Sequence, residues 1–152
     1  MKAITISQPY ASLIATGEKF VENRTWNCNY RGPIAIHAGL GRQYLTKAEL
    51  AKYPTGCVIA IAQLVACKRI EVIKINAHQA GYKNCIDSTN RTWRDVFLHV
   101  HTEGPYCWIL DEIQQIEPVK AVGKQGLWEW EPEQIIERLP GTSMCQTSMA
   151  KD

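Results

Sequence analysis

Residues 17–26 read GEKFVENRTW, and the character of the stretch changes partway along it. From Phe20 onward it is rich in aromatic and β-branched residues, which favours a β-strand. Side chains alternate along a strand, so Glu22, Arg24 and Trp26 would project from the same face. A face with two opposite charges and an indole ring is not a core face. The stretch therefore predicts a strand with a polar surface that is capable of chemistry.

The residues before this strand predict one short strand and one short helix. The strand is expected at residues 2–6. Ser7 can cap the helix that follows, and Pro9 falls in its first turn, where a missing N–H costs nothing. Residues 10–16 carry apolar side chains at the i, i+3, i+4 spacing of a packed helix. Gly17 stands where a left-handed residue would end that helix.

The residues after position 26 predict more strands and few helices. The run at 57–67 is almost entirely apolar and rich in β-branched residues, which is typical of a central strand. Residues 111–116 fit either strand or helix, and Pro118 and Gly123 are expected to break the element that forms. Residues 78–101 begin as a polar, loop-like stretch, and their pattern does not distinguish helix from strand further on. Other strands are expected at residues 34–38, 106–110 and 126–130, and a short helix capped by Thr46 at residues 47–52.

Length and composition limit the organisation of the chain and its partners. A length of 152 residues suits one domain. We place that domain at residues 1–139 and expect residues 140–152 to form a disordered tail of small and polar residues. The net charge of +2 is too small to indicate a polyanionic partner by itself. The chain has no apolar run of about 18 residues, which argues against a membrane partner. It also lacks the long apolar region of a secretory signal, so a cytoplasmic location is the default expectation.

The six cysteines predict reduced thiols and not a disulfide framework. The chain is long, carries no secretory signal and contains no CxxC pair. A zinc site built from Cys28 and His37, or from His99 and His101, would lack paired ligand spacing. We therefore expect neither a metal nor an organic cofactor. The cysteines are Cys28, Cys57, Cys67, Cys85, Cys107 and Cys145.

The residues alone leave two interpretations of the polar cluster open. The sequence has no GxGxxG, P-loop, HExxH or GxSxG motif that would assign an enzyme class. In the functional interpretation, Lys19 and Arg24 line a cleft and bind phosphate or a developing oxyanion, while Glu22 serves as acceptor or general base. In the structural interpretation, Glu22 and Arg24 form an ion pair on a solvated strand, and Lys19 is loose.

Four more residues are candidates for the same cleft. Trp26 or Tyr30 could stack on a base. Arg31 lies in a turn, where it serves either the turn itself or a phosphate contact. His37 alternates with apolar residues in its strand, and is either a proton carrier in the cleft or a structural histidine.

These motifs resemble the ASCH domain family. The resemblance covers about residues 2–131 and is most specific in the first forty residues. The segments at 7–14, 30–38 and 124–130 also look like the family's sequences. The family signature, GxKxxExR, is matched at every position by Gly17, Lys19, Glu22 and Arg24.

The resemblance implies a PUA-like β-barrel with short flanking helices and a cleft that holds the signature. It favours the functional interpretation of the cluster and implies an RNA, nucleoside or nucleotide ligand. Some relatives are hydrolases, and one branch removes acetyl from 4-acetylcytidine with a lysine nucleophile helped by a threonine. Lys19 matches that lysine, but Glu22 stands where the threonine would be. The resemblance also allows a metal-dependent ribonuclease, which would use Glu22, or a non-catalytic protein-interaction domain.

Overall fold

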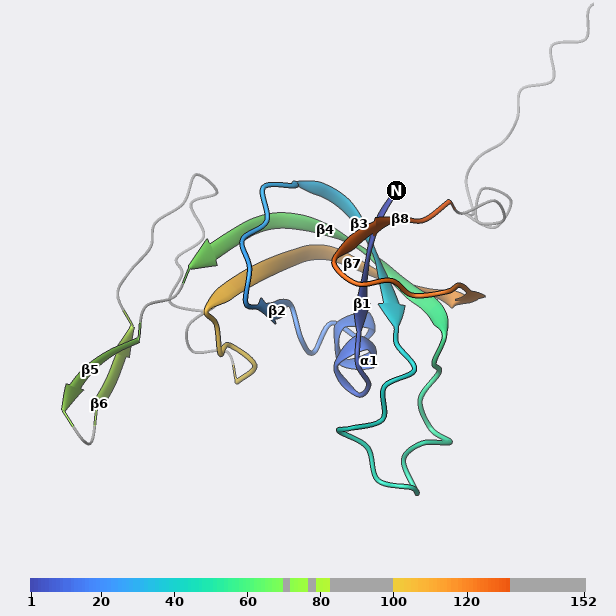
Figure 1. The fold of residues 1–152 in the computed structure, drawn as a ribbon, viewed down its shortest axis with the longest axis horizontal. Coiled ribbons are helices and arrows are strands. Elements are labelled where there is room, and N and C mark those ends of the chain that lie inside the picture. The colour runs from blue at the N-terminus through green and yellow to red at the C-terminus, as the bar shows by residue number, and fades with distance from the viewer. Residues whose placement is uncertain (70–71, 77–78, 83–99, 132–152) are drawn as a thin grey trace, which may run out of the picture.

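The computed structural model describes residues 1–69, 72–76, 79–82 and 100–131. Within these residues the chain is mainly β, with one short α-helix beside the sheet (Figure 1). The mixed, mainly β class predicted from the sequence is confirmed. The elements are β1 (Lys2–Ile6), α1 (Tyr10–Ala15), β2 (Val21–Arg24), β3 (Gly32–Ala38), β4 (Cys57–Arg69), β5 (Val72–Asn76), β6 (Gln79–Tyr82), β7 (Tyr106–Lys120) and β8 (Leu127–Glu129).

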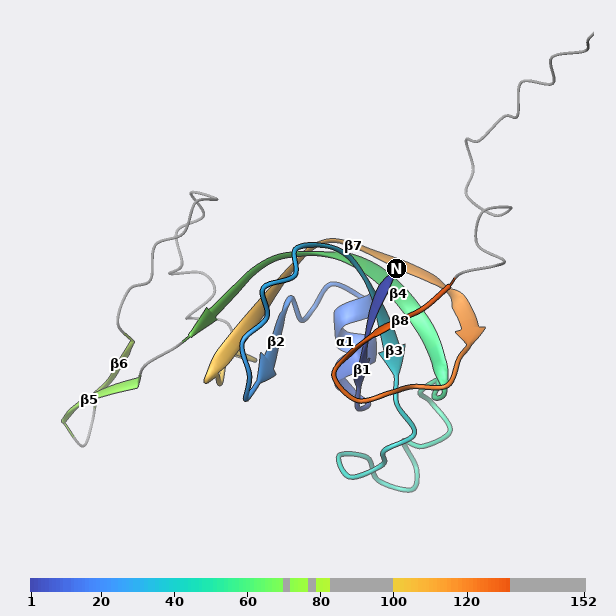
Figure 2. The same ribbon diagram turned by 45° about the horizontal axis from the view of Figure 1, so that its top comes forward.

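Most of the strands form one curled sheet in the order β2-β7-β4-β3-β1-β8. β1 and β3 run parallel, and the other neighbouring pairs are antiparallel. The sheet arches over α1 in both ribbon views, so the helix lies inside the curve (Figures 1 and 2). This curled half-barrel with a helix against it is the PUA-like architecture that the resemblance implies. β5 and β6 pair separately as a two-stranded sheet.

Apolar side chains pack on both faces of the curled sheet. On the face toward α1, residues of β1, β3 and β4 pack against Ile14 and the alanines of the helix. On the other face, Trp128 and Trp130 cover small residues of the central strands. Leu127 packs on the helix side and Trp128 on the opposite side, as alternation along the last strand predicts. The inner face of the curl is therefore the main core, and β2 lies at one edge of it.

The longest strand pair, β4 with β7, gives the sheet its bend. The pairing register shifts at three places along the two strands, and Glu112 in β7 has a φ of 46°. Bulges of this kind bend a strand and increase its twist. The prediction that Pro118 interrupts the element beginning near residue 111 is wrong, because β7 continues through Pro118 to Lys120. Beyond Leu110, β7 pairs with β4 alone, and an edge strand tolerates a proline because one of its sides has no ladder partner.

The start of α1 differs from the prediction, whereas its end agrees with it. Pro9 is the N-cap and makes no side-chain cap bond, so the prediction that Ser7 caps the helix is wrong. The buried Gln8 side chain instead satisfies a main-chain donor at the start of the helix, because its Oε1 accepts the Ser12 N–H at 3.0 Å. Gly17 has a φ of 81°, which confirms the left-handed cap.

The short helix expected at residues 47–52 is replaced by hydrogen-bonded turns. The cap chemistry is present, because Glu49 accepts hydrogen bonds from both the N–H and the hydroxyl of Thr46. A helix of so few residues does not recover its nucleation cost without tertiary packing. The expected loop after residue 78 contains β6 in its first part.

Several sequence predictions fall on parts of the chain outside the described residues. These are the tail at 140–152, most of the undecided stretch at 78–101, His99, Cys85 and Cys145. The proposed domain boundary at residue 139 stays a prediction for the same reason. In the part of the chain that the structure describes, no helix has the length and apolar character needed to cross a membrane.

Candidate functional site

A polar cavity of about 450 Å³ opens beside β2. Its walls come from the end of β1, the start of α1, the turn into β2, β2 itself, Tyr44, and the segment that carries His101 and Glu103. The signature residues Lys19, Glu22 and Arg24 all line it. The structure therefore brings together the three residues to which the sequence analysis gave most weight.

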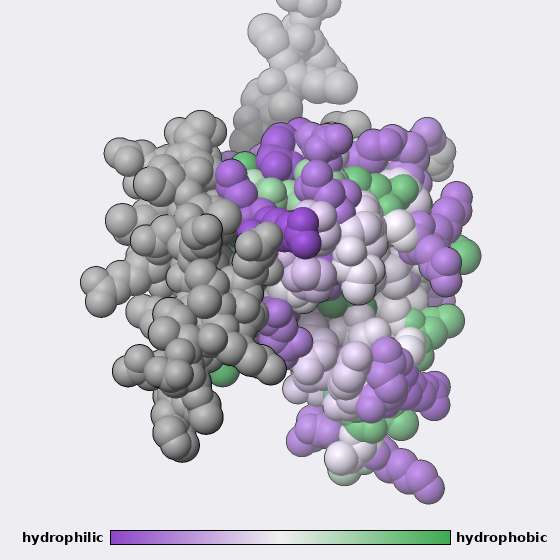
Figure 3. All heavy atoms as spheres, turned by 60° about the vertical axis from the view of Figure 1, so that its left-hand side comes forward, coloured by the Kyte–Doolittle hydropathy of each residue, from purple (hydrophilic) through white to green (hydrophobic). Residues whose placement is uncertain are grey.

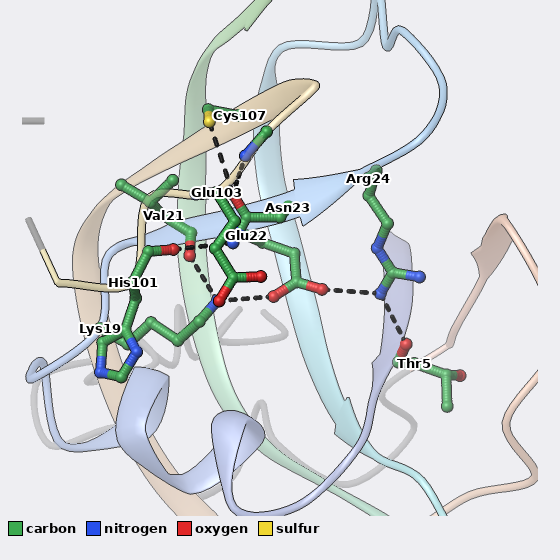
Figure 4. Close-up of polar contacts among 10 residues, drawn as sticks. Thr5, Lys19, Val21, Glu22, Asn23, Arg24, His101, Glu103 and Cys107 are labelled. Atoms are coloured by element: carbon green, nitrogen blue, oxygen red, sulfur yellow. Dashed lines mark hydrogen bonds and ion pairs between the residues drawn. The ribbon is translucent and has the colours of Figure 1, made fainter. Parts of the chain in front are cut away.

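Lys19, Glu22 and Arg24 form one continuous ion-pair cluster (Figure 4). The Lys19 Nζ lies 2.7 Å from Glu22 Oε2, and the Arg24 Nη2 lies 3.0 Å from Glu22 Oε1. Lys19 also donates to the main-chain carbonyl of Val21. Arg24 Nη2 donates to the carbonyl of Thr5 at 2.8 Å, which ties β2 to β1. One carboxylate thus bridges two cations, and the cluster has one excess positive charge.

Two members of the cluster are buried and the Arg24 side chain is 24% exposed, which distinguishes the cluster from an ordinary surface pair. Lys19 is 3% exposed and Glu22 is 8% exposed. Taking charges out of water is costly unless their partners compensate, and a lone surface pair has little energetic consequence. Glu22 and Arg24 do pair, as the structural interpretation expected, but Lys19 is not loose and the strand face is not solvated.

The end of α1 determines where the lysine lies. Gly17 turns the chain back after the helix, and the main-chain N–H of Lys19 donates to the carbonyl of Leu13 at 2.9 Å. Three residues later Glu22 stands in β2, so the helix–strand corner itself holds the two side chains together. The GxKxxE spacing is the local rule for this corner, because the glycine allows the turn and the next residues place the pair.

Asn23 connects β2 to a segment that is distant in sequence. Its Nδ2 donates to the carbonyl of His101 at 2.7 Å, and its Oδ1 accepts the N–H groups of Glu103 and Gly104, each at 2.9 Å (Figure 4). These bonds hold His101 and Glu103 at the cavity. Sequence analysis assigned no role to Asn23 or Glu103 and considered His101 only as a metal ligand. His101 and Glu103 are about 80 positions from Asn23 in the sequence, so no local pattern indicates that they contact it.

Two tyrosines form an aromatic side of the cavity. The rings of Tyr10 and Tyr44 meet edge to face, with centroids 5.2 Å apart. The Lys19 Nζ lies 5.9 Å from the centre of the Tyr10 ring. Sequence analysis missed both as site residues, since Tyr10 fits the packed face of a helix and Tyr44 lies between elements. Such rings offer flat surfaces for an aromatic ligand next to the cations.

The remaining predicted residues lie elsewhere. Tyr30 donates to the carbonyl of Pro33, and Arg31 donates to the carbonyls of Cys28 and Tyr30, so both serve the turn before β3. Neither lines the cavity. Trp26 lines a second cavity next to the first, together with Arg24.

His37 is also separate from the cluster. It is 1% exposed, its Nε2 lies 3.0 Å from the carbonyl oxygen of Ala121, and its ring meets Trp128 edge to face. This is the environment of a structural histidine and not of a proton carrier in the cavity beside β2.

The described cysteines are free, buried thiols, as expected. Burial raises the pKa of Cys57 and Cys67, and raises the pKa of Cys107 to about 11. A thiol that stays protonated at neutral pH is a poor nucleophile and a poor metal ligand. Among the described residues, no group of three or more His, Cys, Asp or Glu side chains gathers around a point.

On the face shown in Figure 3, hydrophilic residues lie around a pale centre of intermediate hydropathy, and the hydrophobic residues form small separate patches. Stable protein interfaces are recognised by contiguous apolar patches rimmed by polar residues. The described residues on this face do not form a broad apolar patch of that kind.

The fold and the cavity together define a small PUA-like β-barrel protein with a buried charge cluster in a polar cleft. A family model described as the ASCH domain matches residues 4–120. The chain belongs to the ASCH domain family.

Solved structures of one bacterial protein agree with this fold. The ASCH protein from Zymomonas mobilis is 21% identical, covers 87% of this chain and 88% of its own, and superposes with a TM-score of 0.51. A Tyr-to-Phe mutant of it gives 21% identity, coverage of 90% and 94%, and a TM-score of 0.50. A Ser-to-Ala mutant gives 16% identity, coverage of 90% and 92%, and a TM-score of 0.52. Likeness at this identity concerns the fold alone. No curated protein matches the chain.

Proposed function

We propose that this ASCH domain binds RNA or a nucleotide in the cavity built on its GxKxxExR signature. The observation that carries the proposal is the buried cluster in which Glu22 bridges Lys19 and Arg24 at the wall of a polar cavity. Buried charge is expensive, so the buried charges of Lys19 and Glu22 at one concave site favour a functional role.

The charges favour a ligand with anionic or strongly polar oxygens. Glu22 offsets one of the two cations, so the cluster has one positive charge to offer. Arginine matches the geometry of phosphate oxygens through its planar set of N–H donors. Arg24 in our proposal holds a phosphate, while Lys19 binds an oxygen of the base or of the phosphate. Glu22 keeps both cations in place.

The aromatic side of the cavity suits the flat part of such a ligand. Tyr10 lies beside Lys19 and meets Tyr44 edge to face, and the His101 ring meets Tyr10 edge to face with a centroid separation of 6.3 Å. Bases exposed from a single strand are recognised by stacking on aromatic rings together with hydrogen bonds to their edges. A volume of about 450 Å³ lies within the ordinary range for small-ligand pockets.

The test is a salt series of binding measurements with a short, labelled single-stranded RNA, followed by fluorescence anisotropy. Arg24→Gln should lower the affinity by about tenfold and reduce the slope of log affinity against log salt by about 1. The control is Lys120→Ala, which removes an exposed positive charge that lines neither cavity. Affinity that does not depend on salt, or equal losses in the two variants, would contradict the proposal.

A second function, hydrolysis of an amide on a modified nucleoside, is supported by the titratable groups that share the cavity with Lys19, namely Glu22, His101 and Glu103. A lysine nucleophile attacks as the neutral amine. The Lys19 nitrogen instead donates to a carboxylate and to a carbonyl, which suits a fixed cation that stabilises an oxyanion. Acetylated cytidine is the substrate to try, and turnover that survives Lys19→Ala would exclude this role.

A further inference from the structure

A second cavity of about 530 Å³ lies directly beside the first. It is bounded by Trp26 and by the segment from Gly123 to Gly126, which connects β7 to β8. Thr5 and Arg24 line both cavities. The two hollows are therefore neighbours that share one wall, and a guanidinium group stands at their boundary.

Arg24 has donor capacity that the protein does not use. Its Nη2 makes the contacts to Glu22 and to Thr5. Its Nε is buried and has no hydrogen-bond partner among the described residues. A buried donor without a partner costs free energy, and such groups are rare in native structures. The Nε is covered by protein atoms, so an acceptor on a ligand at the boundary of the cavities satisfies it only if the arginine side chain turns toward that ligand.

The second cavity combines an aromatic ring with a positive charge. Trp26 is only partly buried, and Trp108 supports it edge to face, with ring centroids 4.6 Å apart. Lys124 is exposed and lines the same cavity. A braced aromatic ring next to a cation is the combination on which single-stranded nucleic acids stack a base and place a phosphate.

The segment that carries Lys124 is held close against the barrel. A Cβ atom added to Gly123 would lie 2.5 Å from His37 Cε1 and 2.8 Å from Thr5 Oγ1, so only glycine fits there without a shift. His37 also holds the carbonyl of Ala121, two residues earlier. The buried His37 thus supports the wall of the second cavity, although it does not line the first cavity.

We propose that the two cavities are adjacent subsites for two successive nucleotides of a single strand, with the connecting phosphodiester at Arg24. The proposal rests on the function proposed above and narrows it to ligands of at least two nucleotide units. The first cavity holds one nucleotide against the tyrosines. The second cavity holds the neighbouring nucleotide, whose base stacks on Trp26. Lys124 neutralises the phosphate on the other side of that nucleotide.

Isothermal titration calorimetry with uridine 5′-monophosphate and with the dinucleotide pUpU tests this arrangement. The wild-type protein should bind pUpU at least about tenfold more tightly, the size expected for one stacked base and one phosphate contact. Trp26→Ala and Lys124→Ala should each remove most of that advantage and leave the affinity for the monophosphate within about twofold. Trp26→Phe, which keeps a ring, should retain part of it.

Two controls separate this inference from the proposed function. Lys47→Ala removes an exposed charge that lines neither cavity, so both affinities should stay unchanged. Lys19→Gln removes a cation that lines only the first cavity, so it should weaken both ligands alike. Monophosphate binding that depends on Lys19 but equals pUpU binding would overturn the second subsite and leave the proposed function standing. Equal loss of both ligands in Trp26→Ala would also overturn it. Absence of binding, or monophosphate binding indifferent to Lys19→Gln, would refute the proposed function itself.

Discussion

β2 (VENR) and β3 (GPIAIHA) are both short strands that carry polar side chains, yet the structure uses these side chains differently. β2 is an edge strand that pairs with β7 alone, and its polar side chains reach a cavity. β3 lies between β1 and β4, and its polar residue, His37, is enclosed by protein. Position within the sheet, and not alternation, decides whether a polar side chain faces a cavity or is enclosed by protein.

The largest expected effect on stability comes from removing the carboxylate of β2 that bridges the two cations. Glu22→Ala leaves the buried Lys19 and the partly exposed Arg24 without their shared partner, and we expect it to lower the free energy of unfolding by about 3 kcal/mol. Urea denaturation measures the change. Glu22→Gln, which keeps the shape and one hydrogen-bond acceptor, should lose less. A loss below about 0.5 kcal/mol in the alanine variant, typical of exposed pairs, would show that the cluster behaves as a solvated surface pair.

Removal of the polar residue of β3 should affect stability without affecting the first cavity. His37→Ala leaves a void in the barrel and frees the carbonyl of Ala121, at an expected cost of about 2 kcal/mol. The affinity for uridine monophosphate should stay within about twofold, because His37 lines neither cavity. Loss of monophosphate binding in a variant that remains folded would mean that β3 contributes to the site directly.

A smaller effect is expected from crowding the segment that His37 supports. Gly123→Ala places a methyl group against His37 and Thr5 and should lower the free energy of unfolding by about 1 to 2 kcal/mol. The same shift should weaken pUpU more than the monophosphate. Gly126→Ala is the comparison, since an added Cβ there meets nothing within 4 Å, although its φ of 69° still carries strain.

The smallest effect concerns Cys107, which lies opposite Asn23 of β2. Burial raises the pKa of Cys107 from 9.0 to about 11. Above pH 9 the unfolded chain releases the thiol proton while the folded chain keeps it, so stability is full below pH 9 and declines as the pH rises toward 11. The expected loss between pH 9 and pH 10 is about 1 kcal/mol. Thermal unfolding of Cys107→Ala should show a shallower decline, and an unchanged slope would contradict this assignment.

Local patterns in the sequence predict much of this fold. The strand at residues 2–6, the left-handed Gly17 and the central strand at 57–67 depend on neighbours in sequence, and each is confirmed. The residues alone left open whether Lys19 is loose, and the family signature singled out Lys19, Glu22 and Arg24; the structure pairs Glu22 with both cations.

Features that depend on distant pairing were not predictable. Alternation does not reveal that β3 is central, so His37 was left open between cleft and core. Pro118 indicates the end of a strand in the sequence. It is compatible with β7 because this part of β7 pairs only with β4 and so lies at an edge of the sheet. Tyr44, His101 and Glu103 reach the cavity only through the tertiary fold, and nothing next to them in sequence marks them.

The hydrogen bonds of Asn23 have a consequence for the timing of ligand exchange. The main-chain N–H groups of Glu103 and Gly104 both donate to the Asn23 Oδ1. The segment that carries Glu103 therefore separates from β2 only when several hydrogen bonds break together. Amide hydrogen exchange at these two positions therefore records how often the cavity wall opens. A ligand that needs that opening to enter or leave can exchange no faster than the wall itself, and the residence time of the ligand is then set by the hydrogen bonds of one side chain at the cavity wall.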